Sequence, residues 1–167
     1  MTVTIRPALE PELPQVGDLV AAAYLDDGLL AADAPYLADI RDAVGRSKDS
    51  VVLVAIDETV EVILGTATWC PALSSHREVA GDREGEFRML GVATRGRGRG
   101  VGEMLVQECI FRAQREDLEA VVISTSPQMQ AARRIYERLG FERVPDRDWT
   151  PVPNFPLWAY RLDLQRS

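Results

Sequence analysis

The stretch TRGRGRGVG, residues 94–102, places four glycines and three arginines in nine positions. An apolar run, EFRMLGV (86–92), precedes it, and apolar side chains at helical spacing follow it from Val101 onward. The first N–H groups of a helix have no internal partner and carry partial positive charge, so an anion binds well at such a junction. The stretch therefore predicts a turn between a strand and a helix that can cradle phosphate groups.

Other uses of a glycine-rich stretch fit this one less well. A nucleotide-triphosphate loop needs lysine and then serine or threonine after its last glycine, and neither follows Gly102. The dinucleotide pattern G-x-G-x-x-G lacks its third glycine whether it starts at Gly96 or at Gly98. An RNA-binding tract would be longer, and a net charge of −7 disfavours broad binding to nucleic acid. A tight turn without any ligand remains the alternative.

The rest of the chain alternates between strand-like and helix-like segments without a linker or repeat. Strands are expected at 3–8, 50–56, 60–70, 86–92, 120–125 and 157–164, and helices at 10–24, 35–44, 101–116 and 128–139. Gly140 follows the last helix where a left-handed residue often ends one. This order predicts a single α/β domain over residues 1–167.

Composition excludes several classes of protein. Of the 167 residues, 46% are hydrophobic and 27% are charged, which is typical of a soluble globular protein. No apolar run approaches the roughly 20 residues that span a bilayer, and the first residues do not resemble a signal peptide. Two cysteines and the single His76 argue against a metal cluster or a disulfide framework. We expect a cytoplasmic protein without a metal, and His76 in a solvated loop.

Two motifs together resemble those of the GCN5-related N-acetyltransferases. RGRGVG (97–102) is similar to the family's signature of Arg or Gln, two residues, Gly, one residue, and Gly or Ala. Downstream, AARRIYERLGF (131–141) is similar to the second motif, in which tyrosine follows alanine by four residues and Gly-Phe comes after it. The resemblance implies a mixed, mostly antiparallel central sheet of six to seven strands, flanked by about four helices.

The resemblance also implies acetyl-CoA, or another acyl-CoA, as cosubstrate. The pantetheine arm would pair with the main chain of Leu90, Gly91 and Val92. The pyrophosphate would lie on the turn formed by Arg97, Gly98, Arg99, Gly100, Val101 and Gly102. Met129 stands where the family often has an asparagine that contacts pantetheine, so that contact is absent or made by another group such as Ser126.

The implied reaction is direct attack of a primary amine on the thioester in a ternary complex. Glu86 would remove the amine's proton, directly or through water, and Tyr136 would protonate the departing thiolate or hold it by a hydrogen bond. An N–H near Val92 would stabilise the oxyanion. Each side chain has a plainer reading: Glu86 as an exposed carboxylate beside Arg88, and Tyr136 as part of the core.

The acceptor amine is not identified by any sequence feature. The resemblance implicates Tyr24, Tyr36, Trp149 and Phe155 in its site, although these aromatics could simply cover the end of the sheet. An acyl-CoA-binding module without turnover is the rival function. Nucleic acid and membrane are not expected as partners, and a homodimer is possible.

Overall fold

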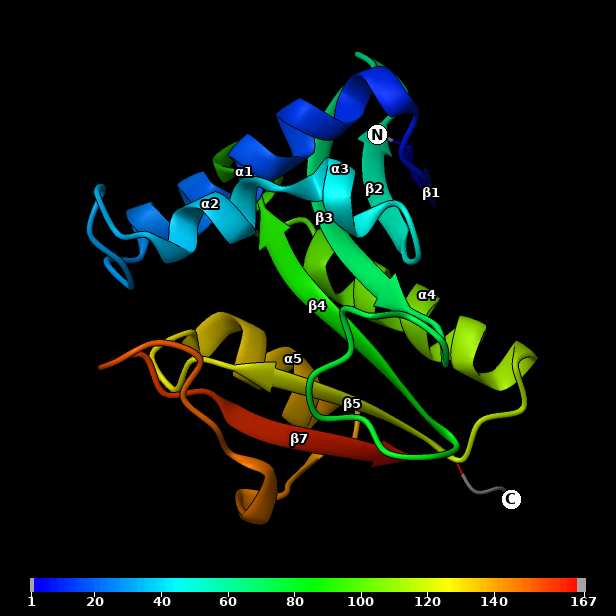
Figure 1. Cartoon of the computed structure of the whole chain (residues 1–167). Coiled ribbons are helices and arrows are strands. Elements are labelled where there is room, and N and C mark those ends of the chain that lie inside the picture. The colour runs from blue at the N-terminus through cyan, green and yellow to red at the C-terminus, as the bar shows by residue number, and fades with distance from the viewer. Residues whose placement is uncertain (1, 165–167) are drawn as a thin grey trace.

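A computed structural model describes residues 2–164 and contains one seven-stranded mixed sheet (Figure 1). The spatial order is β1-β2-β3-β4-β5-β7-β6, and every neighbouring pair is antiparallel except β4 and β5. The strands are β1 Val3–Pro7, β2 Val51–Asp57, β3 Val62–Cys70, β4 Glu84–Val92, β5 Ala120–Thr125, β6 Glu142–Arg143 and β7 Trp158–Asp163. The predicted α/β class and mostly antiparallel sheet are confirmed.

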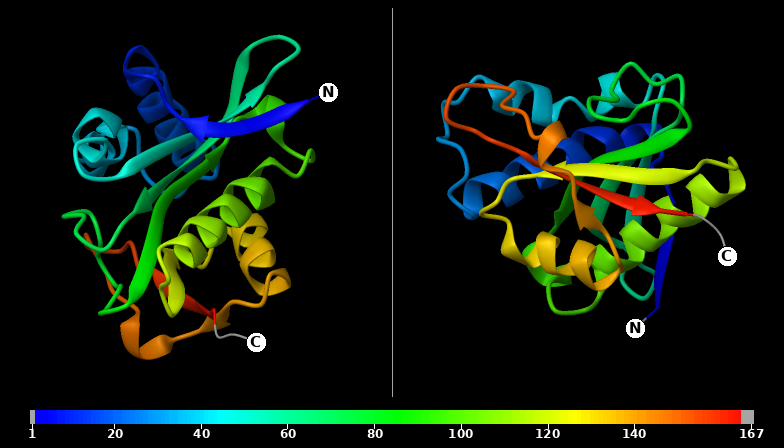
Figure 2. Two further views of the ribbon diagram at one scale, coloured as in Figure 1. Left: turned by 90° about the vertical axis from the view of Figure 1, so that its right-hand side faces the viewer. Right: turned by 90° about the horizontal axis from the view of Figure 1, so that it is seen from below.

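Helices cover both faces of the sheet (Figure 2). They are α1 Leu13–Asp26, α2 Tyr36–Arg41, α3 Ala43–Arg46, α4 Val101–Arg115 and α5 Gln130–Arg138. Because side chains alternate along a strand, Leu53 and Ala55 of β2 join the core under α4 and α5, whereas Val52 and Val54 join the core under α1 and α3. The sheet therefore separates two apolar layers.

Strands β4 and β5 pair only at one end and then diverge (Figure 1). Their parallel register covers Glu84–Glu86 opposite Ala120–Val122 and stops there. Further along β4, Met89 has a φ of 58°, and the register with β3 shifts between Thr66 and Thr68. An irregularity of this kind bends a strand and redirects its main chain. The β5-facing edge of β4 beyond Glu86 is thus left without a strand partner.

The structure corrects two of the predicted helices and adds one strand. The helix expected at 35–44 is two helices, because Asp42 has a φ of −82° and a ψ of 63° and its carboxylate accepts the N–H of Gly45 at 2.9 Å, capping α3. The first helix begins with a 3₁₀ turn at Glu10–Glu12. The two-residue strand β6 was missed, since two residues carry no alternation to detect.

Glu84 joins the start of β4 to the last strand and the loop before it. Its Oε1 accepts Arg147 Nη1 at 2.6 Å and its Oε2 accepts Arg161 Nε at 2.8 Å. Burial alone would raise the pKa of Glu84, but these hydrogen bonds outweigh it and lower the pKa from 4.5 to about 2. A lowered carboxyl pKa stabilises the fold above pH 4.5, and the stabilisation is lost as the pH falls toward 2.

Replacing Glu84 with glutamine should therefore remove an acid-sensitive part of the stability. We expect the free energy of unfolding at pH 7 to fall by about 2–3 kcal/mol, and its decline below pH 4.5 to become shallower. Urea unfolding at several pH values measures both. Glu119→Gln, which breaks an exposed pair with Arg83, is the matched control and should change stability by less than about 1 kcal/mol. Equal effects of the two variants would contradict this account of Glu84.

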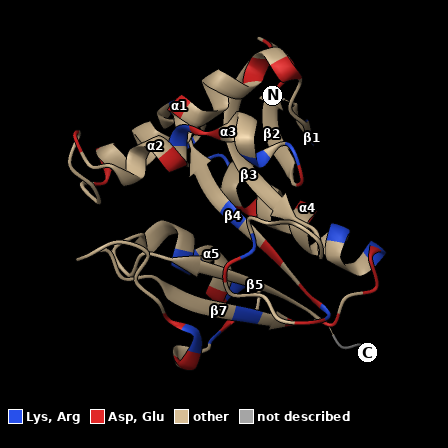
Figure 3. Cartoon of the chain, in the orientation of Figure 1, with Lys and Arg blue, Asp and Glu red and all other residues tan. Residues whose placement is uncertain are grey.

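Charged residues and the two thiols are distributed over the whole fold. Acidic and basic residues are interspersed along the ribbon (Figure 3). Cys70 and Cys109 are free and buried, and burial raises the pKa of Cys70 to about 11. Within residues 2–164, no helix is long and apolar enough to cross a bilayer, and no three potential ligands gather into a metal site.

Candidate functional site

Two cavities share strand β4. The α5-side cleft, of about 600 Å³, is bounded by the end of β4, the 96–102 turn, helix α5 and the end of helix α1. The α2-side cavity, of about 340 Å³, is bounded by α2, α3, β4 and the 149–152 segment. Met89 lines the α2-side cavity, and its neighbour Leu90 lines the α5-side cleft. The two cavities therefore approach each other where β4 is irregular and has left β5.

The 96–102 turn has the strand-to-helix geometry that its sequence predicted. Gly98 and Gly100 have φ angles of 73° and 76°, which side chains other than glycine rarely adopt, and the space beyond each is open. Gly100 immediately precedes α4, so the N–H groups of the first turn of α4 have no partner within the helix. At Gly102, a Cβ would lie 3.0 Å from Ile135 Cδ1, so this glycine lets α4 and α5 pack closely.

Most of the residues predicted to hold the cofactor line the α5-side cleft. Those that do are Leu90, Gly91, Val92, Arg97, Gly98, Gly100, Val101, Gly102 and Met129. Arg99 does not: its Nη2 bonds Asp57 Oδ2 at 2.8 Å and its Nη1 bonds the Arg95 carbonyl at 3.1 Å. Arg99 thus ties the turn to the end of β2, because Asp57 offers a carboxylate on that side.

Ser126, the residue suggested to replace the missing asparagine, also lies outside the α5-side cleft. Its Oγ accepts the N–H of Gln128 at 3.2 Å. Met129 does line it, with its Sδ accepting the Thr125 hydroxyl at 3.7 Å. The side chains at this wall that can bind a polar ligand are instead those of Gln128 and Gln130.

Sequence reasoning also missed two arginines on α5. Arg134 and Arg138 line the α5-side cleft one helical turn apart. Arg138 Nε bonds Glu103 Oε1 at 3.0 Å, which links α5 to the first turn of α4. The four-residue spacing of these arginines could have identified them from the sequence, because residues four apart share one face of a helix. The positive charge in the cleft comes from Arg97, Arg134 and Arg138.

Tyr136 is buried in an aromatic cluster on the side of the sheet that α4 and α5 cover. Its ring lies 5.8 Å from Phe87, 5.7 Å from Phe141 and 5.9 Å from Tyr160. The structure shows no hydrogen bond from its hydroxyl to any residue in 2–164. Burial raises the pKa of Tyr136 far above its ordinary value, so the hydroxyl keeps its proton. Tyr136 lines neither cavity, and its predicted catalytic role stays a prediction.

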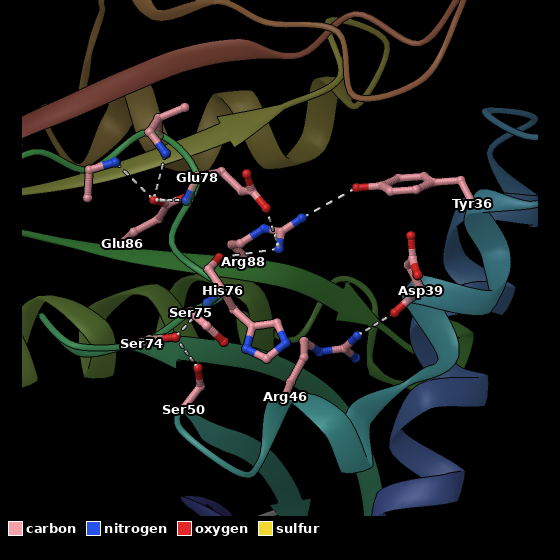
Figure 4. Close-up of polar contacts among 12 residues, drawn as sticks. Tyr36, Asp39, Arg46, Ser50, Ser74, Ser75, His76, Glu78, Glu86 and Arg88 are labelled. Atoms are coloured by element: carbon pink, nitrogen blue, oxygen red, sulfur yellow. Dashed lines mark hydrogen bonds and ion pairs between the residues drawn. The ribbon is translucent and has the colours of Figure 1, made fainter.

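Glu86 is fully buried, so its reading as an exposed carboxylate beside Arg88 is wrong. Its Oε1 accepts three successive main-chain N–H groups, those of Glu78, Val79 and Ala80, at 2.8, 2.9 and 3.0 Å (Figure 4). Its Oε2 has no partner among the described residues. Burial raises the pKa of Glu86, although the three N–H groups act to lower it. The geometry makes Glu86 the anchor of the 78–80 segment, and its role as a base stays a prediction.

An anchoring role predicts a particular response to Glu86→Gln. The three N–H donors would lose a charged acceptor, so the free energy of unfolding should fall by about 2 kcal/mol. Urea unfolding tests this against Asp82→Asn, which removes an exposed carboxylate from the same loop and should cost less than about 0.5 kcal/mol. A variant that keeps its stability and loses turnover would instead identify Glu86 as the base.

The aromatic residues predicted for the acceptor lie together beside the α2-side cavity. Tyr36 and Trp149 line the cavity itself. Phe155 is buried and packs between two tyrosine rings, with its centroid 5.6 Å from that of Tyr36 and 6.2 Å from that of Tyr24. The structure therefore groups Tyr24, Tyr36 and Phe155 in one aromatic cluster and places Trp149 on the lining of the same cavity as Tyr36.

Polar groups that sequence reasoning did not place in a site line the rest of the α2-side cavity (Figure 4). Arg88 Nη2 lies 3.4 Å from the Tyr36 hydroxyl, and Arg88 Nη1 donates to the His76 carbonyl at 3.3 Å. The His76 Nδ1 lies 2.9 Å from Asp49 Oδ1. His76 lies in a loop, as expected, but only 28% of its side chain is exposed and Asp49 holds the ring. The loop joins the site because Glu86 and Arg88 bond its main chain.

Comparisons with known proteins agree with this arrangement. The chain is 29% identical over 112 residues to mycothiol acetyltransferase of Corynebacterium diphtheriae, covering 67% of this chain and 35% of the relative. It is 31% identical over 94 residues to N-acetylaspartate synthetase of Danio rerio, covering 56% of this chain and 32% of the relative. The chain thus spans about a third of the length of these relatives.

The fold is also that of solved acetyltransferase structures. The yncA protein of Salmonella typhimurium, solved with its cofactor acetyl-CoA, superposes with a TM-score of 0.69 at 20% identity, covering 100% of this chain and 96% of that one. The sequence pattern of the acetyltransferase (GNAT) family matches residues 17–141, which include both motifs and most of the sheet. The chain therefore belongs to the acetyltransferase (GNAT) family.

Proposed function

We propose that this protein transfers an acetyl group from acetyl-CoA, bound in the α5-side cleft, to a primary amine bound in the α2-side cavity. The observation that carries the proposal is the pair of cavities that share β4 and approach each other at Met89 and Leu90. A thioester in one cavity and an amine in the other could meet there without either leaving its own cavity. Family membership supports the same reaction class.

The α5-side cleft suits a pyrophosphate and an extended thiol arm. The main-chain N–H groups of residues 98–102 would bind the phosphates at the start of α4, with Arg97 and Arg134 adding charge. The β5-facing edge of β4 at residues 90–92 has no strand partner and would pair with the amides of the pantetheine arm. Arg99 is assigned no direct contact, because Asp57 already binds it.

The chemistry would be direct aminolysis of the thioester. The amine nitrogen attacks the carbonyl carbon, the carbon–sulfur bond breaks, and the thiolate leaves. An alkylamine with a pKa of about 10.4 must first lose a proton at neutral pH, to Glu86 or to solvent. The nitrogen loses a second proton as the amide forms, so the products are the amide, the CoA thiol and one released proton. Tyr136 would give its proton to the thiolate or donate a hydrogen bond to it, and its raised pKa keeps the hydroxyl protonated for the second of these roles. No acyl-enzyme is invoked, because Cys70 and Cys109 are buried.

The acceptor is proposed to be a primary amine of one of three classes. N-acetylaspartate synthetase is named for an N-acetylated amino acid, so amino acids belong in any acceptor panel, together with polyamines and peptide N-termini. A cytoplasmic location, a homodimer and a single domain over residues 1–167 remain predictions.

Initial-rate kinetics test the proposal. Release of CoA thiol would be measured while acetyl-CoA and an active amine from the panel are both varied. Direct transfer predicts reciprocal plots that intersect, with the acetylated amine identified by mass spectrometry. Parallel plots would point to an acyl-enzyme, and acetyl-CoA binding without transfer to any amine would favour a binding module.

A further inference from the structure

Arg46 in α3 is buried but has no anionic partner. Only 2% of the residue is exposed, and it lines the α2-side cavity. Its Nη1 donates to the Asp39 carbonyl at 2.9 Å, whereas its Nε and Nη2 are buried and have no partner among the described residues. A guanidinium remains charged in proteins, and a buried charge without a partner is costly. Burial and the nearby charge of Arg88 both lower the pKa of Arg46.

Arg88 extends from β4 into the same cavity (Figure 4). Its side chain is only 11% exposed, and its contacts with the Tyr36 hydroxyl and the His76 carbonyl are long, at 3.4 and 3.3 Å. The nearest carboxylate, that of Glu78, lies at 3.7 Å, beyond ordinary hydrogen-bond distance. Two guanidinium groups therefore share a small cavity in which, among the described residues, Arg46 has no ion pair and Arg88 has only the long one with Glu78.

The other acidic residues of the cavity form no close ion pair with Arg46, although the charge of Asp42 acts to raise the pKa of Arg46. Asp39 and Asp42 are exposed, whereas Arg46 is buried. Asp42 Oδ1 accepts the N–H of Gly45 at 2.9 Å, and Asp39 meets Arg46 only through its main-chain carbonyl. The cations thus lie at the base of the cavity and these two carboxylates lie nearer to solvent.

We propose that the acceptor amine also carries an oxyanion, a carboxylate or a phosphate, which binds between Arg46 and Arg88. This inference rests on the proposed function and specifies its acceptor. A guanidinium donates two parallel hydrogen bonds to such an oxyanion, and the added negative charge relieves the repulsion between the two arginines. A cavity of about 340 Å³ suits a small acceptor such as an amino acid or an aminoalkyl phosphate.

Matched acceptor pairs test the proposal. Each α-amino acid is compared with its amide, and phosphoethanolamine with ethanolamine, by thiol release at fixed acetyl-CoA. We expect kcat/KM to be at least about tenfold higher for the anionic member of the productive pair, since one charged hydrogen bond contributes about 1.5–3 kcal/mol. The pair that responds distinguishes a carboxylate from a phosphate. In Arg46→Met and in Arg88→Met, the ratio of kcat/KM for the anionic acceptor to kcat/KM for the neutral one should approach one. Arg41→Met removes an arginine of α2 that pairs with Asp18, and this control variant should keep the wild-type ratio.

Thermal unfolding supplies a readout that needs neither acetyl-CoA nor turnover. Replacing a buried, unpaired guanidinium with an apolar side chain of similar length should raise Tm by a few degrees. The anionic member of the pair should raise the Tm of the wild-type protein and leave that of Arg46→Met unchanged. A purely structural arginine would show the reverse, a lower Tm in the variant and no ligand effect.

Two results would overturn the proposal. One is a neutral acceptor that performs as well as its anionic partner, and the other is the absence of any anion-dependent rise in wild-type Tm. A protein that shows this rise but gives no heat on calorimetric titration with acetyl-CoA would refute the proposed function and leave the anion site standing.

Discussion

Replacing Gly100 with glutamate is expected to abolish binding of acetyl-CoA. Gly100 has a φ of 76° and its Cα faces open space at the start of α4. A glutamate there would place a carboxylate where the account puts the pyrophosphate, and would also pay about 1–2 kcal/mol for the left-handed backbone. Calorimetric titration should show at least a hundredfold loss of affinity in a variant that remains folded by circular dichroism.

Two controls separate electrostatic blocking from backbone strain. Gly100→Ala carries the same strain without charge or bulk, so it should lower the unfolding free energy by about 1 kcal/mol and reduce affinity much less. Gly28→Ala introduces similar strain at a φ of 69° in a different turn and should leave affinity unchanged. If Gly100→Glu bound acetyl-CoA as tightly as the wild-type protein, the turn would have no role in the cofactor site.

Tyr136→Phe is expected to lower kcat by about a hundredfold or more while leaving the affinity for acetyl-CoA unchanged. Proton donation by a positioned side chain contributes about 10²–10⁴ in rate. Since the hydroxyl has no hydrogen bond to any residue in 2–164, its removal should alter the unfolding free energy by less than about 1 kcal/mol. Steady-state kinetics, calorimetry and urea unfolding together measure these three quantities.

Tyr160→Phe is the matched control for this experiment. Tyr160 belongs to the same aromatic cluster, with its ring 5.9 Å from that of Tyr136, but its hydroxyl bonds Glu137 Oε2 at 3.2 Å. Loss of this hydroxyl should cost some stability and leave kcat within a factor of two or so. Equal kcat values in the wild-type protein and Tyr136→Phe would show that Tyr136 has only a packing role in the core.

Local patterns in the sequence were sufficient for most of the elements and for the turn. The positive φ of Gly140 follows from glycine at the C-terminal end of a helix, and β5 is found at 120–125, as its apolar run indicated. Nine of the eleven predicted cofactor residues line the α5-side cleft; eight of them flank one strand-to-helix junction, and the ninth, Met129, immediately precedes α5. Neighbours in sequence remain neighbours in space there.

Distant contacts account for what the sequence did not reveal. Arg99 turns to Asp57, 42 residues earlier, and Glu86 bonds a loop whose path depends on the whole sheet. Arg46 and Arg88 come from α3 and β4, and only the packed fold places both around one cavity. Such partners depend on tertiary packing, which neither periodicity nor spacing encodes.

The most direct measurement for the central claim is calorimetric titration of the wild-type protein with acetyl-CoA, with free CoA and NADP as comparisons. The account predicts saturable binding of one acetyl-CoA per chain, binding of CoA to the same site, and no heat with NADP beyond dilution. A folded protein that binds neither acetyl-CoA nor CoA would contradict the account, and the 94–102 stretch would then be a turn without a ligand.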